Sequence, residues 1–181
     1  MAFEDFSIPP YPATGDILIV DDTPVNLRLL SNMLLSHGYN VRQAINGKMA
    51  LRAVDVVQPD LILLDIMMPD LDGYEVCKML KANPKTAKIP VIFLSALNDV
   101  FDKVKAFDVG GVDYIGKPFQ FEEVLVRVQT HLSLQAAHLQ ICELNADLEK
   151  RVSQRTQELE AANLQLRIHN TVCSIRYYRS Y

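Results

Sequence analysis

The sequence has few cysteines, little net charge and no long apolar run. The three cysteines, Cys77, Cys142 and Cys173, lie far apart and lack the spacing of metal ligands, which argues against a disulfide framework or zinc site and fits a reducing cytoplasm. A net charge of -4 gives no reason to expect nonspecific binding to nucleic acid or to a bilayer surface, and we expect no direct binding to nucleic acid. No stretch reaches the ~18 apolar residues of a membrane span, so we expect no membrane partner.

The amino-terminal segment also lacks the features of a targeting peptide. Residues 1–15 contain no basic start followed by an apolar block. Because Pro9, Pro10 and Pro12 fall within this segment, we expect a disordered tail.

Residues 16–132 alternate between short runs of Val, Ile and Leu and longer segments with helical spacing. This alternation predicts one α/β domain, a doubly wound parallel sheet with helices on both faces. The predicted strands cover 17–21, 39–45, 60–65, 90–95 and 112–115. The predicted helices cover 24–37, 47–57, 73–83 and 99–109. Thr23-Pro24 provides a capping residue followed by proline in the first turn, which is typical of a helix start.

The segment from Phe121 to Arg167 contains neither Gly nor Pro, which predicts one long helix. Its apolar residues follow a heptad register with a seam formed by Leu134, Ile141, Leu148, Val152, Leu159 and Leu166. His138 and Asn145 also fall on this seam, so the pairing is expected to be modest. A single amphipathic helix is the alternative, but a segment of roughly 50 Å is longer than a small domain covers.

We therefore predict a coiled-coil helix over 133–167, continuous with the last helix of the domain. Two copies of the chain would pair through it as a homodimer. Residues 168–181 abandon the heptad and are predicted to form an irregular tail.

Polar residues follow or end four of the predicted strands: Asp21, Asp22, Asp65, Ser95 and Lys117. In open parallel sheets, functional groups gather at the carboxyl ends of the strands, and the strand order 2-1-3-4-5 would make these ends neighbours. Three carboxylates close together repel one another unless a cation intervenes. Oxygen ligands of this kind suit Mg²⁺. Beside a metal ion and Lys117, Asp65 could attack a phosphoryl group while Ser95 donates a hydrogen bond to it.

The loop after the third predicted strand contains two further acids. Asp70 and Asp72 with Gly73 predict a turn into the next helix, with Asp72 as the cap.

The fragments "ILIVDD" at 17–22, "LLDIMMPDLDG" at 63–73, "VIFLSA" at 91–96 and "DYIGKPF" at 113–119 resemble the receiver domain of two-component response regulators. The resemblance covers Asp16 to Leu132. It implies a flavodoxin-like five-stranded sheet in the order 2-1-3-4-5. It also implies that Asp65 is the phosphoacceptor, Asp22 a direct Mg²⁺ ligand and Asp21 a partner acting through metal-bound water. The backbone carbonyl of Met67 would complete the protein ligands.

The same resemblance assigns the remaining site residues. Ser95 and Lys117 would bind the phosphoryl oxygens, and the peptide bond before Pro118 would be cis. Tyr114 matches the family's switch aromatic, which would move when Ser95 moves and so alter the surface near the fourth and fifth helices.

Two further positions influence how water reaches the phosphorylated aspartate in the family. Met67 and Leu97 occupy them and are both apolar, so we expect a comparatively long-lived phosphoryl group.

The resemblance implies a cytoplasmic phosphorelay switch, not an enzyme, that receives its phosphoryl group from a sensor histidine kinase or a phosphotransfer protein. The segment after the domain resembles connectors that precede histidine-kinase or cyclic-dinucleotide-synthase modules. One alternative is an Mg²⁺-dependent phosphatase or phosphotransferase of the aspartyl-nucleophile type, but "VDDTP" places two acids side by side where that class separates them by one residue. The other alternative is a pseudo-receiver that dimerises without phosphorylation.

Overall fold

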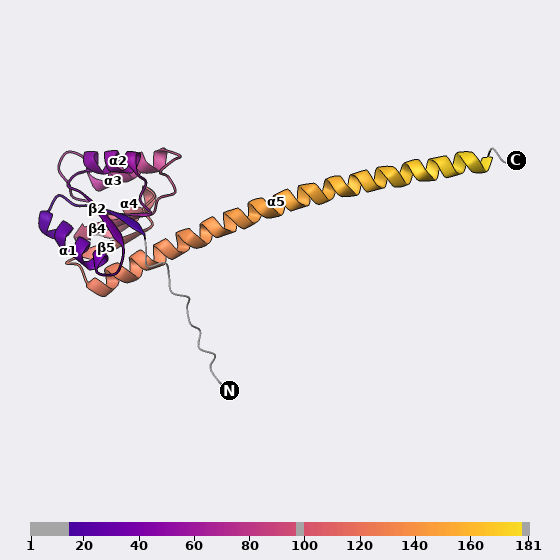
Figure 1. The fold of residues 1–181 in the computed structure, drawn as a ribbon. Coiled ribbons are helices and arrows are strands. Elements are labelled where there is room, and N and C mark those ends of the chain that lie inside the picture. The colour runs from indigo at the N-terminus through magenta and orange to yellow at the C-terminus, as the bar shows by residue number, and fades with distance from the viewer. Residues whose placement is uncertain (1–14, 97–99, 179–181) are drawn as a thin grey trace, which may run out of the picture. The chain divides into compact units, whose positions relative to one another are not determined.

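A parallel five-stranded sheet lies at the centre of the fold (Figure 1). The computed structural model describes residues 15–96 and 100–178, with side chains at 15–96, 104–160, 163 and 164. The strands are β1 (Asp16–Val20), β2 (Asn40–Ala44), β3 (Leu61–Asp65), β4 (Val91–Ala96) and β5 (Asp113–Lys117). The helices are α1 (Pro24–Leu35), α2 (Gly47–Val56), α3 (Gly73–Ala82), α4 (Val100–Asp108) and α5 (Phe121–Tyr178).

The strand order is β2-β1-β3-β4-β5, and every pair is parallel. The register sets Val20 beside Leu64 and Asp65 beside Leu94, so the carboxyl ends of neighbouring strands are level with one another. The predicted fold class and strand order are confirmed, and each predicted strand boundary lies within two residues of the observed one.

Alternate residues of each strand face opposite sides of the sheet and build two separate cores. Ile17 and Ile19 pack with residues of α1 and α5, whereas Leu18 and Val20 pack with residues of α2, α3 and α4. All of Leu61–Asp65 is buried, as expected for a central strand covered on both faces. Burying one such aliphatic side chain stabilises the fold by about 1.5–3 kcal/mol, so the sheet is a rigid base for the groups at its edge.

Helix starts differ in how they are capped. Asp72 accepts the Glu75 amide at 2.8 Å and Glu75 returns the contact, so the predicted cap of α3 is a full capping box. Thr23 precedes Pro24 at the start of α1 but makes no side-chain capping bond. Its hydroxyl instead donates to Asp22 Oδ1 at 3.3 Å, because an acid precedes it in the sequence.

The chain divides into a first unit that ends at Gln135 and a second unit that begins at Ala136. Helix α5 belongs to both, and it continues to Tyr178, where the sequence predicted an irregular tail from residue 168. No Gly or Pro occurs between residues 121 and 178, so the end of the heptad pattern does not end the helix. The predicted disordered tail lies outside the described residues except for Gly15.

Within residues 15–96 and 100–178, no helix combines the length and the apolar character needed to cross a bilayer.

Candidate functional site

The carboxyl ends of β1, β3 and β5 bring two buried acids and one lysine into contact. Asp21 directly follows β1, and Asp65 and Lys117 are the last residues of β3 and β5. Lys117 Nζ lies 2.9 Å from Asp21 Oδ2 and 2.8 Å from Asp65 Oδ2. One ammonium group therefore serves two carboxylates, because the strand order places their strand ends on the same edge of the sheet.

Asp21 is fully buried, and donors surround its carboxylate. Oδ1 accepts the Thr23 amide at 2.8 Å and the Asn26 side-chain amide at 3.1 Å. Oδ2 accepts Asn26 Nδ2 at 2.9 Å as well as Lys117 Nζ. These contacts hold the carboxylate of Asp21 in a fixed orientation at the end of β1.

Asn26 was not predicted from the sequence. It lies on the first turn of α1, where its amide reaches back to Asp21, and an Asn in an otherwise ordinary helical segment offers no signal of this contact.

Asp22 is the exposed member of the acidic cluster, and the Thr23 hydroxyl at 3.3 Å is its one recorded contact among the described residues. Asp21, Asp22 and Asp65 each offer an oxygen, and these oxygens lie within 4.8 Å of one another. Carboxylates at this separation repel, and a hard divalent cation with several oxygen ligands removes the repulsion. The donor set therefore fits Mg²⁺, with Asp22 able to turn an oxygen toward it.

Asp65 is 4% exposed and carries an unbalanced charge. Burial raises the pKa of its carboxyl above the ordinary value, and the charge of Asp21 adds to this effect. Lys117 and the Met67 amide, which donates to Oδ1 at 3.3 Å, act in the opposite direction without cancelling it. The ionised carboxylate is thus held in an environment that disfavours it.

The pKa of Lys117 depends on the same contacts with Asp65 and Asp21. Burial alone would lower the pKa of its ammonium group, but hydrogen bonds to Asp65 and Asp21 outweigh burial and raise it. Lys117 is therefore charged at neutral pH. The Lys117–Pro118 peptide bond is cis, as the resemblance implied.

Ser95 and Tyr114 lie outside this group of charged contacts. Ser95 is half-buried near the end of β4 and pairs with Gly116 of β5. The next residue, Ala96, pairs with Lys117. Tyr114 lies earlier on β5 and is half-buried, with its ring near Phe107 of α4. Leu97, at the second water-controlling position, lies outside the described residues.

The loop after β3 is tightly folded beside the acidic cluster. A Cβ atom at Gly73 would overlap the backbone carbonyl oxygen of Asp65, so only glycine allows α3 to begin this close to the strand end. The Gly73 amide donates to the Ile66 carbonyl at 3.0 Å, and Asp70 adopts a left-handed conformation with φ of 69°. Gly73 therefore fixes the path of the backbone that carries Met67, a role beyond the turn predicted for it.

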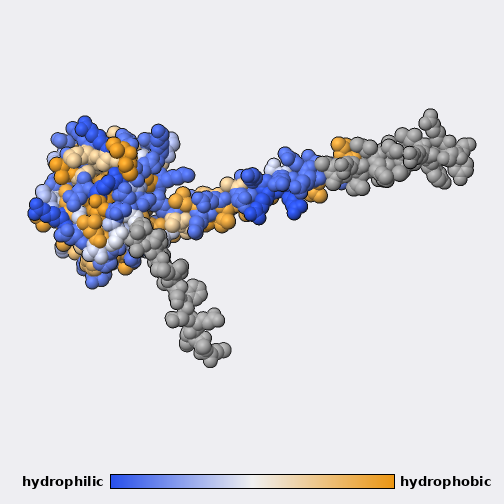
Figure 2. Space-filling view, in the orientation of Figure 1, coloured by the Kyte–Doolittle hydropathy of each residue, from blue (hydrophilic) through white to orange (hydrophobic). Residues whose placement is uncertain are grey.

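The predicted seam of α5 is exposed in the second unit and just before it. Its described members have exposed fractions between 55% and 64%: Leu134, Ile141, Leu148, Val152 and Leu159. The side chain of Leu166 lies outside the described ones. Figure 2 shows apolar residues in orange at intervals among polar residues along this part of the helix. Apolar side chains that recur at heptad spacing along one helix are typical of a coiled-coil seam.

Residues 17–129 match the response regulator receiver domain family. The match covers more than half of the 181 residues, and the chain belongs to this family. Response regulators interact with histidine kinases, and receiver domains in general bind Mg²⁺, for which the acidic cluster offers oxygen ligands.

Relatives carry the receiver domain in longer proteins. The DNA-binding dual master transcriptional regulator RpaA of Synechocystis sp. is 46% identical over 64% of this chain and 48% of its own length. A probable cyclic di-GMP phosphodiesterase of Vibrio cholerae is 40% identical over 80% of this chain and 32% of its own length. The chain thus spans about a third to a half of these proteins. Because RpaA is described as DNA-binding, the expectation that nucleic acid is not a partner finds no support.

A solved structure shows the same fold. The signal receiver domain of a signal transduction histidine kinase from Syntrophus aciditrophicus superposes with a TM-score of 0.62 and 39% identity, covering 66% of this chain and 90% of that one.

Proposed function

We propose that this protein is a phosphorylation switch in which Asp65 accepts a phosphoryl group from a phosphohistidine of a sensor kinase or phosphotransfer protein in the cytoplasm. An oxygen of Asp65 attacks phosphorus, a P–O bond forms, and the P–N bond to the donor imidazole breaks. The observation that carries the proposal is the contact of Lys117 with both buried acids, 2.8 Å from Asp65 and 2.9 Å from Asp21.

The residues around Asp65 have separate roles, some in binding the metal ion and some in binding the phosphoryl oxygens. Asp22, Asp65 and the Met67 carbonyl would hold Mg²⁺, with Asp21 acting through water. The ion supplies charge neutralisation for the phosphoryl oxygens. Lys117, already beside Asp65, pairs with one of these oxygens when the group arrives, and Ser95 donates a hydrogen bond to another.

The change at Asp65 is passed on through Ser95 and Tyr114. When Ser95 moves toward the phosphoryl group, the ring of Tyr114 shifts, and the surface formed by α4 and the start of α5 repacks. Support for this route comes from Tyr114 itself, whose half-buried ring lies 6.4 Å from that of Phe107 on α4.

The long helix gives the switch an output by pairing with a second copy. The seam is 55–64% exposed at its described members, and a helix of this length cannot be covered by the domain alone. Leu148→Asp places a charge on the seam and should shift the chain to monomer, as measured by light scattering. Leu139→Asp is the matched control, because Leu139 is equally exposed but lies off the seam. Equal effects of the two substitutions would remove the proposed pairing.

The switch is separated from the alternatives by one experiment. Incubation with acetyl phosphate and Mg²⁺ should add a single phosphoryl group per chain, and Asp65→Asn should prevent it. A phosphatase would instead release many equivalents of phosphate from substrate. A pseudo-receiver would stay unmodified and still dimerise.

A further inference from the structure

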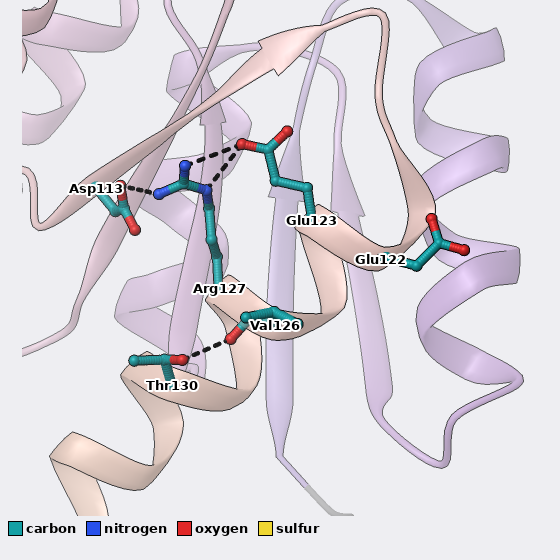
Figure 3. Close-up of a pocket in the computed structure, with 6 residues that line it drawn as sticks. All are labelled: Asp113, Glu122, Glu123, Val126, Arg127 and Thr130. Carbon is teal, nitrogen blue, oxygen red and sulfur yellow. Dashed lines mark hydrogen bonds and ion pairs between the residues drawn. The ribbon is translucent and has the colours of Figure 1, made fainter.

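Three charged side chains and one histidine join the start of β5 to the first turns of α5; Figure 3 shows the part of this cluster around Arg127. Arg127 Nη1 lies 2.6 Å from Asp113 Oδ1, and its Nε and Nη2 each lie 3.0 Å from Glu123 Oε1. Asp113 Oδ2 also lies 3.1 Å from His131 Nε2. We call Asp113, Glu123, Arg127 and His131 the β5–α5 cluster.

Asp113 is the centre of the β5–α5 cluster. Its side chain is 19% exposed, and it also accepts the amide of Tyr114 at 2.8 Å. Burial would raise the pKa of this carboxyl, but hydrogen bonds from Arg127 and His131 outweigh burial and lower it. The ionised carboxylate is therefore well satisfied, and it holds two successive turns of α5 against β5.

The guanidinium of Arg127 also contacts an aromatic ring. Arg127 Cζ lies 5.6 Å from the centre of the Tyr114 ring, within the range of a cation–π contact. The ring also lies near that of Phe107, with ring centres 6.4 Å apart and planes at 81°. The ring of Tyr114 is thus near Phe107 of α4 and Arg127 of α5. Because Asp113 and Glu123 orient the Arg127 guanidinium, they also determine where it meets the ring.

We propose that Arg127 is a positioning residue that links the ring position of Tyr114 to α5. In the conformation seen here, Arg127 holds the ring beside α5. When the ring moves away, the cation–π contact is lost, while the ion pairs with Asp113 and Glu123 remain. The inference rests on the proposed function, and it names the residue through which the change at Asp65 reaches the helix.

Linkage makes this coupling measurable at the phosphorylation site. Because Arg127 stabilises the conformation without a phosphoryl group, removing its contact must favour the activated one, and a ligand that selects the activated conformation must bind more tightly. A partly exposed cation–π contact corresponds to a change of about 2- to 5-fold in an equilibrium constant.

The test is a double-mutant cycle read by ¹⁹F NMR titration of beryllofluoride in the presence of Mg²⁺. Arg127→Gln should raise the apparent affinity by about 2- to 5-fold. In the Tyr114→Ala background, the same substitution should have no effect, because the ring that it contacts is absent. Arg127→Lys keeps the charge but not the planar group, and should give an intermediate change. Arg151→Gln is the control, since Arg151 pairs with Asp147 far along the helix.

The outcomes separate the inference from the proposed function. An affinity unchanged by Arg127→Gln, or changed equally with and without Tyr114, overturns the inference while the proposed function stands. A change in oligomeric state without a change in affinity also overturns it, because the β5–α5 cluster would then be a contact with a second copy. A wild type that fails to take up beryllofluoride, or an Asp65→Asn variant that binds it equally, overturns both. Thermal unfolding of each variant verifies that it is folded.

Discussion

Asp65 and Asp113 are two largely buried acids of the same domain, each in contact with a basic side chain, yet their environments act in opposite directions. The pKa of Asp65 is raised by burial and by its neighbour Asp21, despite Lys117. The pKa of Asp113 is lowered, because hydrogen bonds from Arg127 and His131 overcome the effect of burial. Asp65 shares the Lys117 ammonium with the fully buried Asp21, whereas Asp113 shares the Arg127 guanidinium with the half-buried Glu123 and has a further contact with the His131 imidazole. Asp65 is thus fit to receive a cation and a phosphoryl group, and Asp113 to hold elements together.

The largest expected difference between the two sites is in metal binding. Asp22→Asn should weaken Mg²⁺ binding at least ~100-fold, since even lost outer-shell partners cost about 10- to 100-fold. Mg²⁺ binds the folded state and should raise the unfolding temperature of wild type and Asp113→Asn, but hardly that of Asp22→Asn. Asp55→Asn, on the exposed surface of α2, is the control. Equal stabilisation of all four proteins by Mg²⁺ would mean that the ion binds elsewhere.

Removing the charge of Asp113 should destabilise the fold. Its lowered pKa means that it contributes stability above its ordinary value of 3.8, and that this contribution is lost as the pH falls through the lower folded-state pKa. Asp113→Asn should therefore cost about 1–2 kcal/mol near pH 7, or about 2–8 °C in unfolding temperature. The difference from wild type should shrink in acid. A constant difference at every pH would show that packing, not charge, is responsible.

Removing the charge of Asp65 should have the opposite effect on the stability of the fold. A folded-state pKa above the ordinary 3.8 favours the folded state at low pH, and this advantage is lost as the pH rises through the raised value. At pH 7 without Mg²⁺, Asp65→Asn should stabilise the fold, because it removes a buried carboxylate whose ionised form the folded state disfavours. Urea unfolding in the presence of EDTA measures this. A destabilised variant would show that the ionised carboxylate of Asp65, like that of Asp113, stabilises the fold.

The smallest expected effect concerns access to Asp65 once it is phosphorylated. Met67 is 75% exposed beside Asp65 and offers no group that orients water. Met67→Glu should speed the loss of the phosphoryl group severalfold, well below the ~100-fold that a well-placed general base supplies. Decay after removal of acetyl phosphate gives the rate, and Met79→Glu on the exposed face of α3 is the control. An unchanged rate would show that position 67 does not control the attacking water.

The contrast between the two acids also shows what a sequence reveals. Asp65 was predictable because an apolar strand that ends on an acid is conspicuous, and because parallel strands bring such ends to one edge. Asp113 and Arg127 gave no such signal, since a charged residue at the start of a strand and another on a helix are ordinary. Their pairing depends on where α5 packs.

Two local features follow the same logic. The Asn26 contact with Asp21 and the close approach at Gly73 depend on backbone paths that no local pattern encodes. Helix α5 continues past the end of the heptad to Tyr178, because a heptad describes one face of a helix and no Gly or Pro interrupts residues 121–178.

The most direct test of the account is the site and stoichiometry of phosphorylation. After incubation with acetyl phosphate and Mg²⁺, mass spectrometry of the intact chain and of its peptides should find a single phosphoryl group on Asp65, with none on Asp65→Asn or without Mg²⁺. A phosphoryl group that persists in Asp65→Asn, or that lies on another residue, would contradict the account.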